Sequence, residues 1–319
     1  MLGRRELCIL VVNFNTRHLL DEMLAALKQD PAFDSARLVL VDNASTDGSA
    51  EYLKSAFSEH TLLFSESNIG FGRANNLALD RVDSEFVLLL NTDAFIAPDS
   101  LTRSLAYMRS DPKCGVLGVK LVSRDGSLQP SCRYFPAPLN MFLSRSGLSR
   151  FLPWVRGVDD MNWAHDEVRE CDWVPGCFYL IRRELIDLLG LFDPRYFLYY
   201  EEVDHCRAVK AAGWKVVYFP GTSVVHIGGE SAKSAGELTQ SGRQISILQV
   251  ESELLFIRKH HGLVGLCLHL ILSALSALWV GVKGVLRGKG SRRFIEELGA
   301  LRLAWRLVRQ TAWGTRPTR

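Results

Sequence analysis

The amino-acid sequence predicts an α/β fold with a mostly parallel sheet and helices on both of its faces, continued by a helical C-terminal extension. Two observations carry this prediction. Short apolar runs rich in Val, Ile and Leu alternate with longer amphipathic segments through the first third of the chain, which is the pattern of β-α-β units. Near the C-terminus, an uncharged run at residues 263–282 is followed by a basic amphipathic segment.

Five apolar runs predict the first strands, and the segments between them predict helices. The strands are expected at residues 7–12, 38–41, 62–64, 86–90 and 115–119, and the helices at residues 16–29, 48–57, 70–79 and 98–110. The last helix has a clear start, because Pro98 suits the first turn and Asp99 complements the helix dipole.

Residues 121–172 contain several prolines and glycines without sustained periodicity, so we expect long loops there, and such loops are often functional. Regular structure is expected again at residues 173–182. A helix follows at residues 201–212, ended by a glycine, and two further short strands are expected at residues 215–219 and 223–226.

The uncharged run at residues 263–282 is long enough to cross a bilayer. In the segment after it, basic residues outnumber the acidic ones, which suits an anionic cytoplasmic leaflet, and apolar residues recur at helical spacing. A spanning helix, an interfacial helix and a helix packed on the protein itself remain alternatives. The predicted organisation is an α/β domain at residues 1–230, a connecting helical segment at 231–261 and a hydrophobic, then basic, tail at 262–319.

Composition narrows the class of protein. The chain has 319 residues, of which 47% are hydrophobic and 23% are charged, with a net charge of +3. These values indicate an ordinary folded protein and give no reason to expect nucleic acid as a partner. The seven cysteines form no Cys-x-x-Cys pair, which argues against a zinc knuckle or a disulfide framework and fits a reducing compartment. The apolar run at 7–12 is too short for a signal-peptide core.

Polar side chains follow the first two predicted strands, at the edge where ligands bind in open α/β sheets. Asn13 and Asn15 follow the first strand, and the run VDNASTD at residues 41–47 ends the second. Asp42 is suited to accept hydrogen bonds from a base or a ribose hydroxyl. The alternative for these residues is a role as turn formers or helix caps, which for Asp47 is the preferred interpretation.

A third cluster, NIGFGRANN at residues 68–76, places glycines between a strand and a helix. Backbone amides at such a helix start can receive an anionic phosphate, and Arg73 adds positive charge. The cluster lacks the Gly-x-Gly-x-x-Gly spacing of a dinucleotide-binding fold, so alone it is a weak signal.

Two further polar clusters that contain carboxylates complete the series. Asn91, Thr92 and Asp93 end an apolar strand, and a carboxylate there can hold Mg²⁺ or Mn²⁺. The run YYEEVDH at residues 199–205 places three carboxylates at the start of a helix. Like-charge repulsion between them raises at least one pKa, which is useful in a general base, although a favourable interaction with the helix dipole is the alternative explanation.

The ordered series of motifs resembles the inverting glycosyltransferases of family two, which have the Rossmann-like GT-A fold. The similarity covers residues 7–230. The bacterial rhamnosyltransferase-like branch is the most similar, on the motifs VDNASTD, NxGFGxxxN, NTD, YxEExD and VVHxGGxS at residues 41–47, 68–76, 91–93, 199–204 and 224–231.

The resemblance implies a role for each cluster. The residues implied on the nucleotide-sugar side are Asn13, Asn15, Asp42, Asn43, Asn68, Gly70, Arg73, Asn76, Asn91 and Thr92. Asp93 and His226 are implied to hold Mn²⁺ or Mg²⁺, and Trp173 and Gly176 to line the acceptor side. The family pattern usually has Glu-Asp where this chain has Glu201-Glu202. Glu202 is therefore the expected base, with Glu201 and Asp204 as further candidates.

The implied activity is metal-dependent hexosyl transfer, with inversion, from a nucleotide-diphosphate sugar to a glycan or lipid-linked acceptor in cell-envelope polysaccharide synthesis. On the branch resemblance alone, TDP-rhamnose is the first expected donor and UDP-sugars are the next. With its tail, the protein is expected at the cytoplasmic face of the inner membrane, either peripheral or held by a single C-terminal segment. The alternatives are a sugar nucleotidyltransferase, which should carry a basic glycine-rich N-terminal loop, and an inactive sugar-nucleotide-binding scaffold.

Overall fold

The structure is a computed structural model that describes residues 5–152, 154–228, 247–286 and 292–319. The chain forms two compact units. The first comprises residues 1–133, 161–194 and 201–234, and the second comprises residues 134–160, 195–200 and 235–319. The last residues of the predicted VVHxGGxS motif, 229–231, and the first part of the predicted connecting segment lie outside the described residues.

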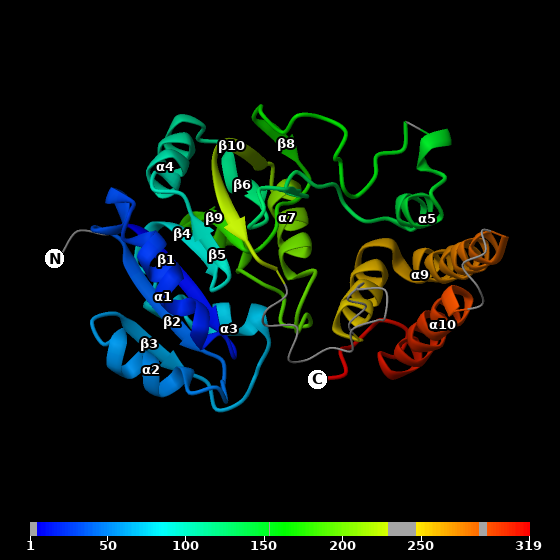
Figure 1. Cartoon of the computed structure of the whole chain (residues 1–319), viewed down its shortest axis with the longest axis horizontal. Coiled ribbons are helices and arrows are strands. Elements are labelled where there is room, and N and C mark those ends of the chain that lie inside the picture. The colour runs from blue at the N-terminus through cyan, green and yellow to red at the C-terminus, as the bar shows by residue number, and fades with distance from the viewer. Residues whose placement is uncertain (1–4, 153, 229–246, 287–291) are drawn as a thin grey trace. The chain divides into compact units, whose positions relative to one another are not determined.

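The first unit is built around a ten-stranded sheet with the order β3-β2-β1-β4-β9-β6-β10-β5, in which β7 pairs with β6 and β8 with β10 (Figure 1). The strands are β1 Arg5–Asn13, β2 Arg37–Asp42, β3 Thr61–Phe64, β4 Ser84–Asn91, β5 Ala94–Ile96, β6 Cys114–Val122, β7 Leu128–Gln129, β8 Arg169–Cys171, β9 Phe178–Arg182 and β10 Lys215–His226.

The α/β fold class is confirmed, but the sheet is mixed. The predicted parallel pairing holds for β1 with β2 and β4, for β2 with β3, and for β6 with β10. In contrast, β9 runs antiparallel between β4 and β6, and the short strands β5, β7 and β8 also pair antiparallel. These short strands escaped prediction because two or three residues carry no measurable period of alternation.

The two short strands expected at 215–219 and 223–226 are one strand, β10. Its pairing with β6 shifts register between Phe219 and Ser223, so three residues bulge out of the ladder. Pro220 lies in this bulge and has no N–H to donate, which explains why the ladder bypasses it instead of ending.

All five predicted helices of the first unit are present, and one more, α6, was not predicted. They are α1 Leu20–Leu27, α2 Ser49–Ala56, α3 Phe71–Leu77, α4 Ser100–Ser110, α6 Arg183–Leu189 and α7 Glu201–Ala211. The helix expected from residue 16 begins with a separate 3-10 turn at Arg17–Leu19. Most of the observed helices are shorter than predicted, as is usual at frayed ends.

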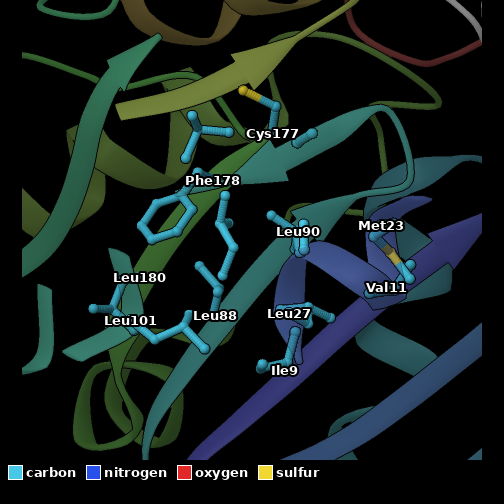
Figure 2. Packing of buried hydrophobic residues seen from close by; sticks show 14 of the residues in the cluster. Ile9, Val11, Met23, Leu27, Leu88, Leu90, Leu101, Cys177, Phe178 and Leu180 are labelled. Atoms are coloured by element: carbon cyan, nitrogen blue, oxygen red, sulfur yellow. The ribbon is translucent and has the colours of Figure 1, made fainter. Parts of the chain in front are cut away.

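Apolar side chains of neighbouring strands pack under α1 to form the core of this unit (Figure 2). Ile9 and Val11 of β1 and Leu88 and Leu90 of β4 are fully buried and lie two positions apart, on one face of the sheet. Each such side chain contributes about 1.5–3 kcal/mol to folding. This packing holds the carboxyl ends of β1 and β4 in a fixed relation, and those ends carry the polar motifs.

The second unit contains α5 Pro138–Ser146, α9 Ile247–Leu286 and α10 Arg292–Gln310. α5 lies where irregular loops were expected; Pro138 is a helix-starting residue here, and the Asn140 side chain caps the helix by accepting a hydrogen bond from the Ala137 N–H. α9 is interrupted at Gly262, whose backbone is not helical (φ 68°, ψ −169°). The predicted tail begins at this residue.

α9 is apolar on its exposed side. Its stretch Ile247–Val285 has a mean hydropathy of 2.2 in its most apolar window, which is 28% buried, and by length and composition it is the one helix among the described residues that could cross a membrane. Large apolar side chains are exposed at intervals of three or four residues after Gly262. They are Val264, Leu268, Ile271, Leu275, Leu278, Val282 and Val285, and Leu263 and Trp279 are exposed next to them.

Candidate active site

The polar motifs meet at one edge of the sheet because three of the strands that carry them run parallel and in register. Asn13 of β1 lies opposite Asp42 of β2, and Val12 lies opposite Asn91 of β4. The carboxyl ends of parallel strands come together at a single edge, where open α/β sheets bind ligands.

Asn13, Asp42 and Ser45 form a hydrogen-bonded group at this edge. The Asn13 amide donates to Asp42 Oδ1 (2.8 Å) and to Ser45 Oγ (2.9 Å), and the Ser45 backbone N–H donates to Asp42 Oδ2 (3.1 Å). Asn13 and Asp42 are both buried. Each oxygen of Asp42 therefore accepts a bond from the protein, which fixes the direction of the carboxylate.

Asn15 joins the loop after β1 to the loop after β2. Its backbone is left-handed (φ 54°), a conformation that Asn tolerates better than most residues. Its side-chain oxygen accepts a bond from the Thr46 N–H (2.7 Å), and its own N–H donates to Ser45 Oγ (3.0 Å).

Asn43 and Asn68 connect the loop after β2 with the glycine-rich segment. The Asn43 amide donates to Asn68 Oδ1 (2.9 Å), and its oxygen accepts from the Ile69 N–H (3.0 Å). The Gly70 N–H, predicted to face a phosphate, donates to Asn68 Oδ1 (3.0 Å). Gly70 has φ 87°, which favours glycine at this position.

Arg73 and Asn76 of α3 hold the backbone of residues 192–194. Arg73 Nε donates to the Pro194 carbonyl oxygen (2.7 Å). The Asn76 amide donates to the Phe192 carbonyl oxygen (2.7 Å) and accepts from the Phe192 N–H (3.1 Å). The structure thus gives both residues a bracing role, and their assignment to the nucleotide sugar stays a prediction.

The middle residue of the Asn-Thr-Asp motif is tied to the end of β1. Thr16 Oγ1 donates to Asn13 Oδ1 (2.8 Å) and lies 2.8 Å from Thr92 Oγ1, so Thr92 is the donor to Thr16. Thr92 is buried. Asn91 Oδ1 is also buried but, within the described part of the chain, accepts no hydrogen bond. Buried acceptors are nearly always paired, so this atom is available to a ligand.

Asp93 and His226 face each other across a short ladder. β5 and β10 pair antiparallel with His226 opposite Ala94, and the Ile227 N–H donates to the Asp93 carbonyl oxygen (3.0 Å). His226 Nε2 lies 3.6 Å from Asp93 Oδ1. Burial lowers the pKa of His226, and the Asp93 carboxylate opposes that shift. A neutral imidazole and a carboxylate together fit a divalent cation.

The two glutamates at the start of α7 have different surroundings. Glu201 is 3% exposed and faces α3, since a Cβ on Gly72 would lie 3.6 Å from the Glu201 Cβ. Burial raises the pKa of Glu201, and the Glu202 carboxylate raises it further. Glu202 faces Gly176 instead, where a Cβ would lie 3.8 Å from the Glu202 Cβ. Two predicted site residues, Glu202 and Gly176, are therefore neighbours.

Cys177 follows Gly176, the neighbour of Glu202, and is hydrogen-bonded to the Asn-Thr-Asp motif. Its carbonyl oxygen accepts a bond from the Asn91 N–H (3.1 Å). Burial raises the pKa of the Cys177 thiol, and the carboxylates of Asp93 and Glu202 raise it further, so the thiol is within electrostatic reach of both. The sequence placed this position in the segment expected on the acceptor side but assigned Cys177 itself no role, because a buried cysteine has the pattern of any small apolar residue.

Trp173 and Asp204, the remaining predicted residues, are buried. Trp173 is 5% exposed, and the Arg133 guanidinium lies 4.0 Å from the centre of its ring. Asp204 is buried beside His205. His205 Nε2 donates to the Gly190 carbonyl oxygen (3.1 Å), and the Tyr179 hydroxyl lies 2.7 Å from its Nδ1.

Comparison with known proteins shows that this chain is similar to glycosyltransferases. Residues 8–159 match the family model described as Glycosyl transferase family 2. The chain is 30% identical over 207 residues to the N-acetylglucosaminyl-diphospho-decaprenol L-rhamnosyltransferase of Mycobacterium tuberculosis, which covers 59% of this chain and 66% of that protein. It is 27% identical over 170 residues to the rhamnosyltransferase WbbL of Escherichia coli, which covers 49% of this chain and 60% of that protein.

Solved structures show the same fold at low sequence identity. The mannosyltransferase PcManGT from Pyrobaculum calidifontis, in complex with GDP-Man and Mn²⁺, has a TM-score of 0.52 at 18% identity, covering 98% of this chain and 76% of that one. GalNAc-T7 with UDP, GalNAc and Mn²⁺ has a TM-score of 0.55 at 15% identity, covering 81% of this chain and 48% of that one.

Proposed function

The chain carries a glycosyl transferase family 2 domain, and from this premise we propose that it is a metal-dependent, inverting hexosyltransferase that uses a nucleotide-diphosphate sugar. The observation that supports the proposal best is the pair formed by Asp93 and His226. His226 Nε2 and Asp93 Oδ1 are 3.6 Å apart. Gly176 adjoins Glu202, and the next residue, Cys177, is hydrogen-bonded to the Asn91 N–H.

The nucleotide binds, in this proposal, along the ends of β1 and β2. Asp42 offers a carboxylate whose orientation is fixed by Asn13 and Ser45, and Asn68 reaches the same edge through Asn43. Asn91 contributes a buried side-chain oxygen that accepts no hydrogen bond from the described residues. A ribose hydroxyl or a hydroxyl of the donor sugar would satisfy it.

Asp93 and His226 would hold the divalent cation, Mn²⁺ or Mg²⁺, through one oxygen and one nitrogen. Hard cations of this kind commonly take their other ligands from substrate phosphates and water. When bound, the cation supplies positive charge that offsets the charge developing on the diphosphate leaving group. Since His226 is buried with a lowered pKa, its imidazole is neutral near pH 7, the state required of a ligand.

Glu202 acts as the base. It adjoins Gly176 of the acceptor-side segment, whereas Glu201 is buried against α3 with a raised pKa. Glu202 accepts the proton of the acceptor hydroxyl as that oxygen attacks the anomeric carbon from the face opposite the diphosphate. The bond to the diphosphate breaks in the same displacement, which inverts the anomeric centre.

For the donor sugar we propose rhamnose, carried by TDP, with UDP-sugars as the next candidates. The support is that two of the similar relatives bear the names of rhamnosyltransferases. For the acceptor we propose a lipid-linked glycan of the cell envelope, because the name of the mycobacterial relative specifies a diphospho-decaprenol acceptor.

The position that we propose is the cytoplasmic face of the inner membrane, and the apolar surface of the second unit supports contact with a membrane. α9 exposes the apolar stripe that begins at Val264, and exposed apolar surfaces of this extent mark protein or membrane contacts. A cavity of about 580 Å³ in this unit is lined by apolar side chains of α9 and α10 together with Arg145, Glu253 and His269.

Turnover of a panel of nucleotide sugars, with Mn²⁺, with Mg²⁺ and with EDTA, tests the proposal. We expect release of the nucleoside diphosphate that stops in EDTA. Pyrophosphate release from a nucleoside triphosphate and a sugar phosphate would identify a nucleotidyltransferase instead. Binding of a nucleotide sugar without turnover of any donor and acceptor would identify an inactive scaffold.

Two substitutions test the assigned roles. Asp93→Ala should abolish transfer while the free energy of unfolding changes little, and Glu202→Gln should retain donor binding but lose at least 100-fold in kcat, the usual scale of a lost general base. Asp187→Asn, an exposed carboxylate on α6, is the matched control. Full turnover by Glu202→Gln, together with loss of turnover in Glu201→Gln, would show that Glu201 is the base.

A further inference from the structure

A short hairpin formed by β6 and β7 contacts His226 through Gln129 and was not part of any predicted motif. β6 and β7 pair antiparallel with Leu121 opposite Gln129, and the Ser123 N–H closes the loop by donating to the Ser127 carbonyl oxygen (2.8 Å). The Gln129 carbonyl oxygen accepts a bond from Ser131 Oγ (2.9 Å). The backbone of Gln129 is therefore held on both sides.

The side chain of Gln129 contacts His226 at two atoms. Gln129 Nε2 donates to the His226 carbonyl oxygen (2.7 Å) and to Ser123 Oγ (3.0 Å), and Gln129 Oε1 lies 3.0 Å from His226 Nδ1. A backbone carbonyl oxygen can only accept, so the amide nitrogen must face it. The amide oxygen must then face the ring.

This orientation determines where the imidazole carries its proton. Because Gln129 Oε1 can only accept, His226 Nδ1 must be an N–H. In a neutral imidazole the proton on Nδ1 leaves a lone pair on Nε2. That nitrogen is the one that lies 3.6 Å from Asp93 Oδ1.

Two lone pairs therefore face each other at a largely buried position, with the side chains of His226 and Asp93 18% and 7% exposed. Two acceptors at this separation repel each other, and a cation bound by both relieves the repulsion. The opposite tautomer would instead direct an N–H at Asp93 and block the nitrogen.

We propose that Gln129 is a positioning residue that holds His226 in the tautomer with the proton on Nδ1, and thereby prepares Nε2 to bind a divalent cation together with Asp93. The inference deepens the proposed function and rests on its assignment of the metal ligands. Hydrogen-bonded partners of metal-binding histidines act in this way in general, and their loss typically weakens metal binding about 10- to 100-fold.

The tautomer is measured without metal, donor or turnover. Long-range ¹H–¹⁵N correlation spectra of the metal-free full chain at pH 8, assigned with a His226→Asn variant, should show a protonated Nδ1 and an unprotonated Nε2. In Gln129→Leu the signals should shift toward the other tautomer. The opposite tautomer in the unaltered chain, or no change in Gln129→Leu, would overturn the proposal.

Metal affinity is measured separately, with MnCl₂ alone and electron paramagnetic resonance of free Mn²⁺. We expect Gln129→Leu to bind Mn²⁺ about 10- to 100-fold more weakly, while Gln29→Leu, the same change at an exposed position, binds as the unaltered chain does. A changed tautomer with unchanged Mn²⁺ affinity would also overturn the proposal. If the unaltered chain binds Mn²⁺ but turns over no donor, the result counts against the proposed activity and not against the role of Gln129. The two failures are therefore distinguishable.

Discussion

Glu201 and Glu202 are adjacent in sequence but differ in their surroundings, which shows how single residues acquire distinct chemistry here. Glu201 packs against α3, where burial raises its pKa, whereas Glu202 adjoins Gly176. Two carboxylates so close cannot ionise independently. When the buried one holds its proton, the other can remain a carboxylate near pH 7, and environment rather than residue type separates their roles.

His205 provides a test of buried charge at the residue scale. Burial lowers the pKa of His205 to about 4, from an ordinary value of 6.5. Between pH 4 and pH 6.5, His205 is protonated in the unfolded chain but neutral in the folded chain. The free energy of unfolding therefore decreases as the pH falls from 6.5 toward 4. The loss amounts to roughly 3 kcal/mol in the free energy of unfolding.

Urea unfolding between pH 4 and 8 checks this prediction. The difference in unfolding free energy between the unaltered chain and His205→Gln should change with pH across that window, since only the former gains a proton on unfolding. A difference that stays constant from pH 7 to pH 4 would mean that His205 titrates normally in the folded protein.

At the scale of elements, close approach between segments limits which residues β6 can carry. A Cβ on Gly118 would lie 2.5 Å from the Val174 Cβ, closer than side-chain atoms come. Val174 is fully buried and lies between Trp173 and Gly176, the two residues predicted to line the acceptor side. The absence of a side chain at Gly118 thus allows Trp173 to Gly176 to lie directly on the sheet.

Gly118→Ala should therefore destabilise the fold by about 1–3 kcal/mol, the usual cost of overpacking a core. Chemical denaturation measures this effect directly. The pairing with β10 continues on either side of Gly118, so the loss should appear in the midpoint and not in the slope of the transition.

Gly299 of α10 is the matched comparison, because among the described residues no atom outside its own helical turn lies within 4 Å of where its Cβ would be. Gly299→Ala should increase the stability of α10 by about 1 kcal/mol through helix propensity alone. Helix content measured by circular dichroism during thermal unfolding reports it. If Gly299→Ala lowers the stability instead, another segment packs against α10 at residue 299.

At the scale of elements, sequence patterns predicted the longer parallel strands and missed the shortest strands. The parallel strands β1, β2, β3 and β4 were predictable because each is an apolar run that ends in polar residues. β5 and β7 were not, since a strand of two or three residues has too few positions to show alternation. Yet β5 positions Asp93 and β7 carries Gln129, so the missed elements are those that complete the candidate metal site.

At the scale of the whole molecule, the candidate active site and the exposed apolar surface belong to different units. The first unit contains the polar edge of the sheet, and the second exposes the apolar stripe of α9. Chain segments 134–160 and 195–200 belong to the second unit although they interrupt the first in sequence. Residues 195–200 lead directly into α7, which carries Glu202.

Membrane binding is predicted to depend on the α9 stripe. The double variant Leu268→Glu with Leu275→Glu places two carboxylates on it, and we expect at least a 10-fold loss of binding to vesicles that contain anionic lipid. Sedimentation with vesicles measures it. Leu188→Glu, at an apolar residue of the first unit that is 67% exposed, should bind like the unaltered chain. Equal sedimentation of the double variant would exclude α9 as the contact.

The sequence by itself determined the α/β class, the order of the motifs and their location at strand ends, because alternation, apolar runs and helix signals are local and each needs only a few neighbouring residues. Only the tertiary structure decided which distant residues meet. Gln129 and His226 are 97 positions apart, and Glu202 rather than Glu201 faces Gly176. Such contacts depend on strand order, register and close packing between segments, which leave no local pattern in the chain.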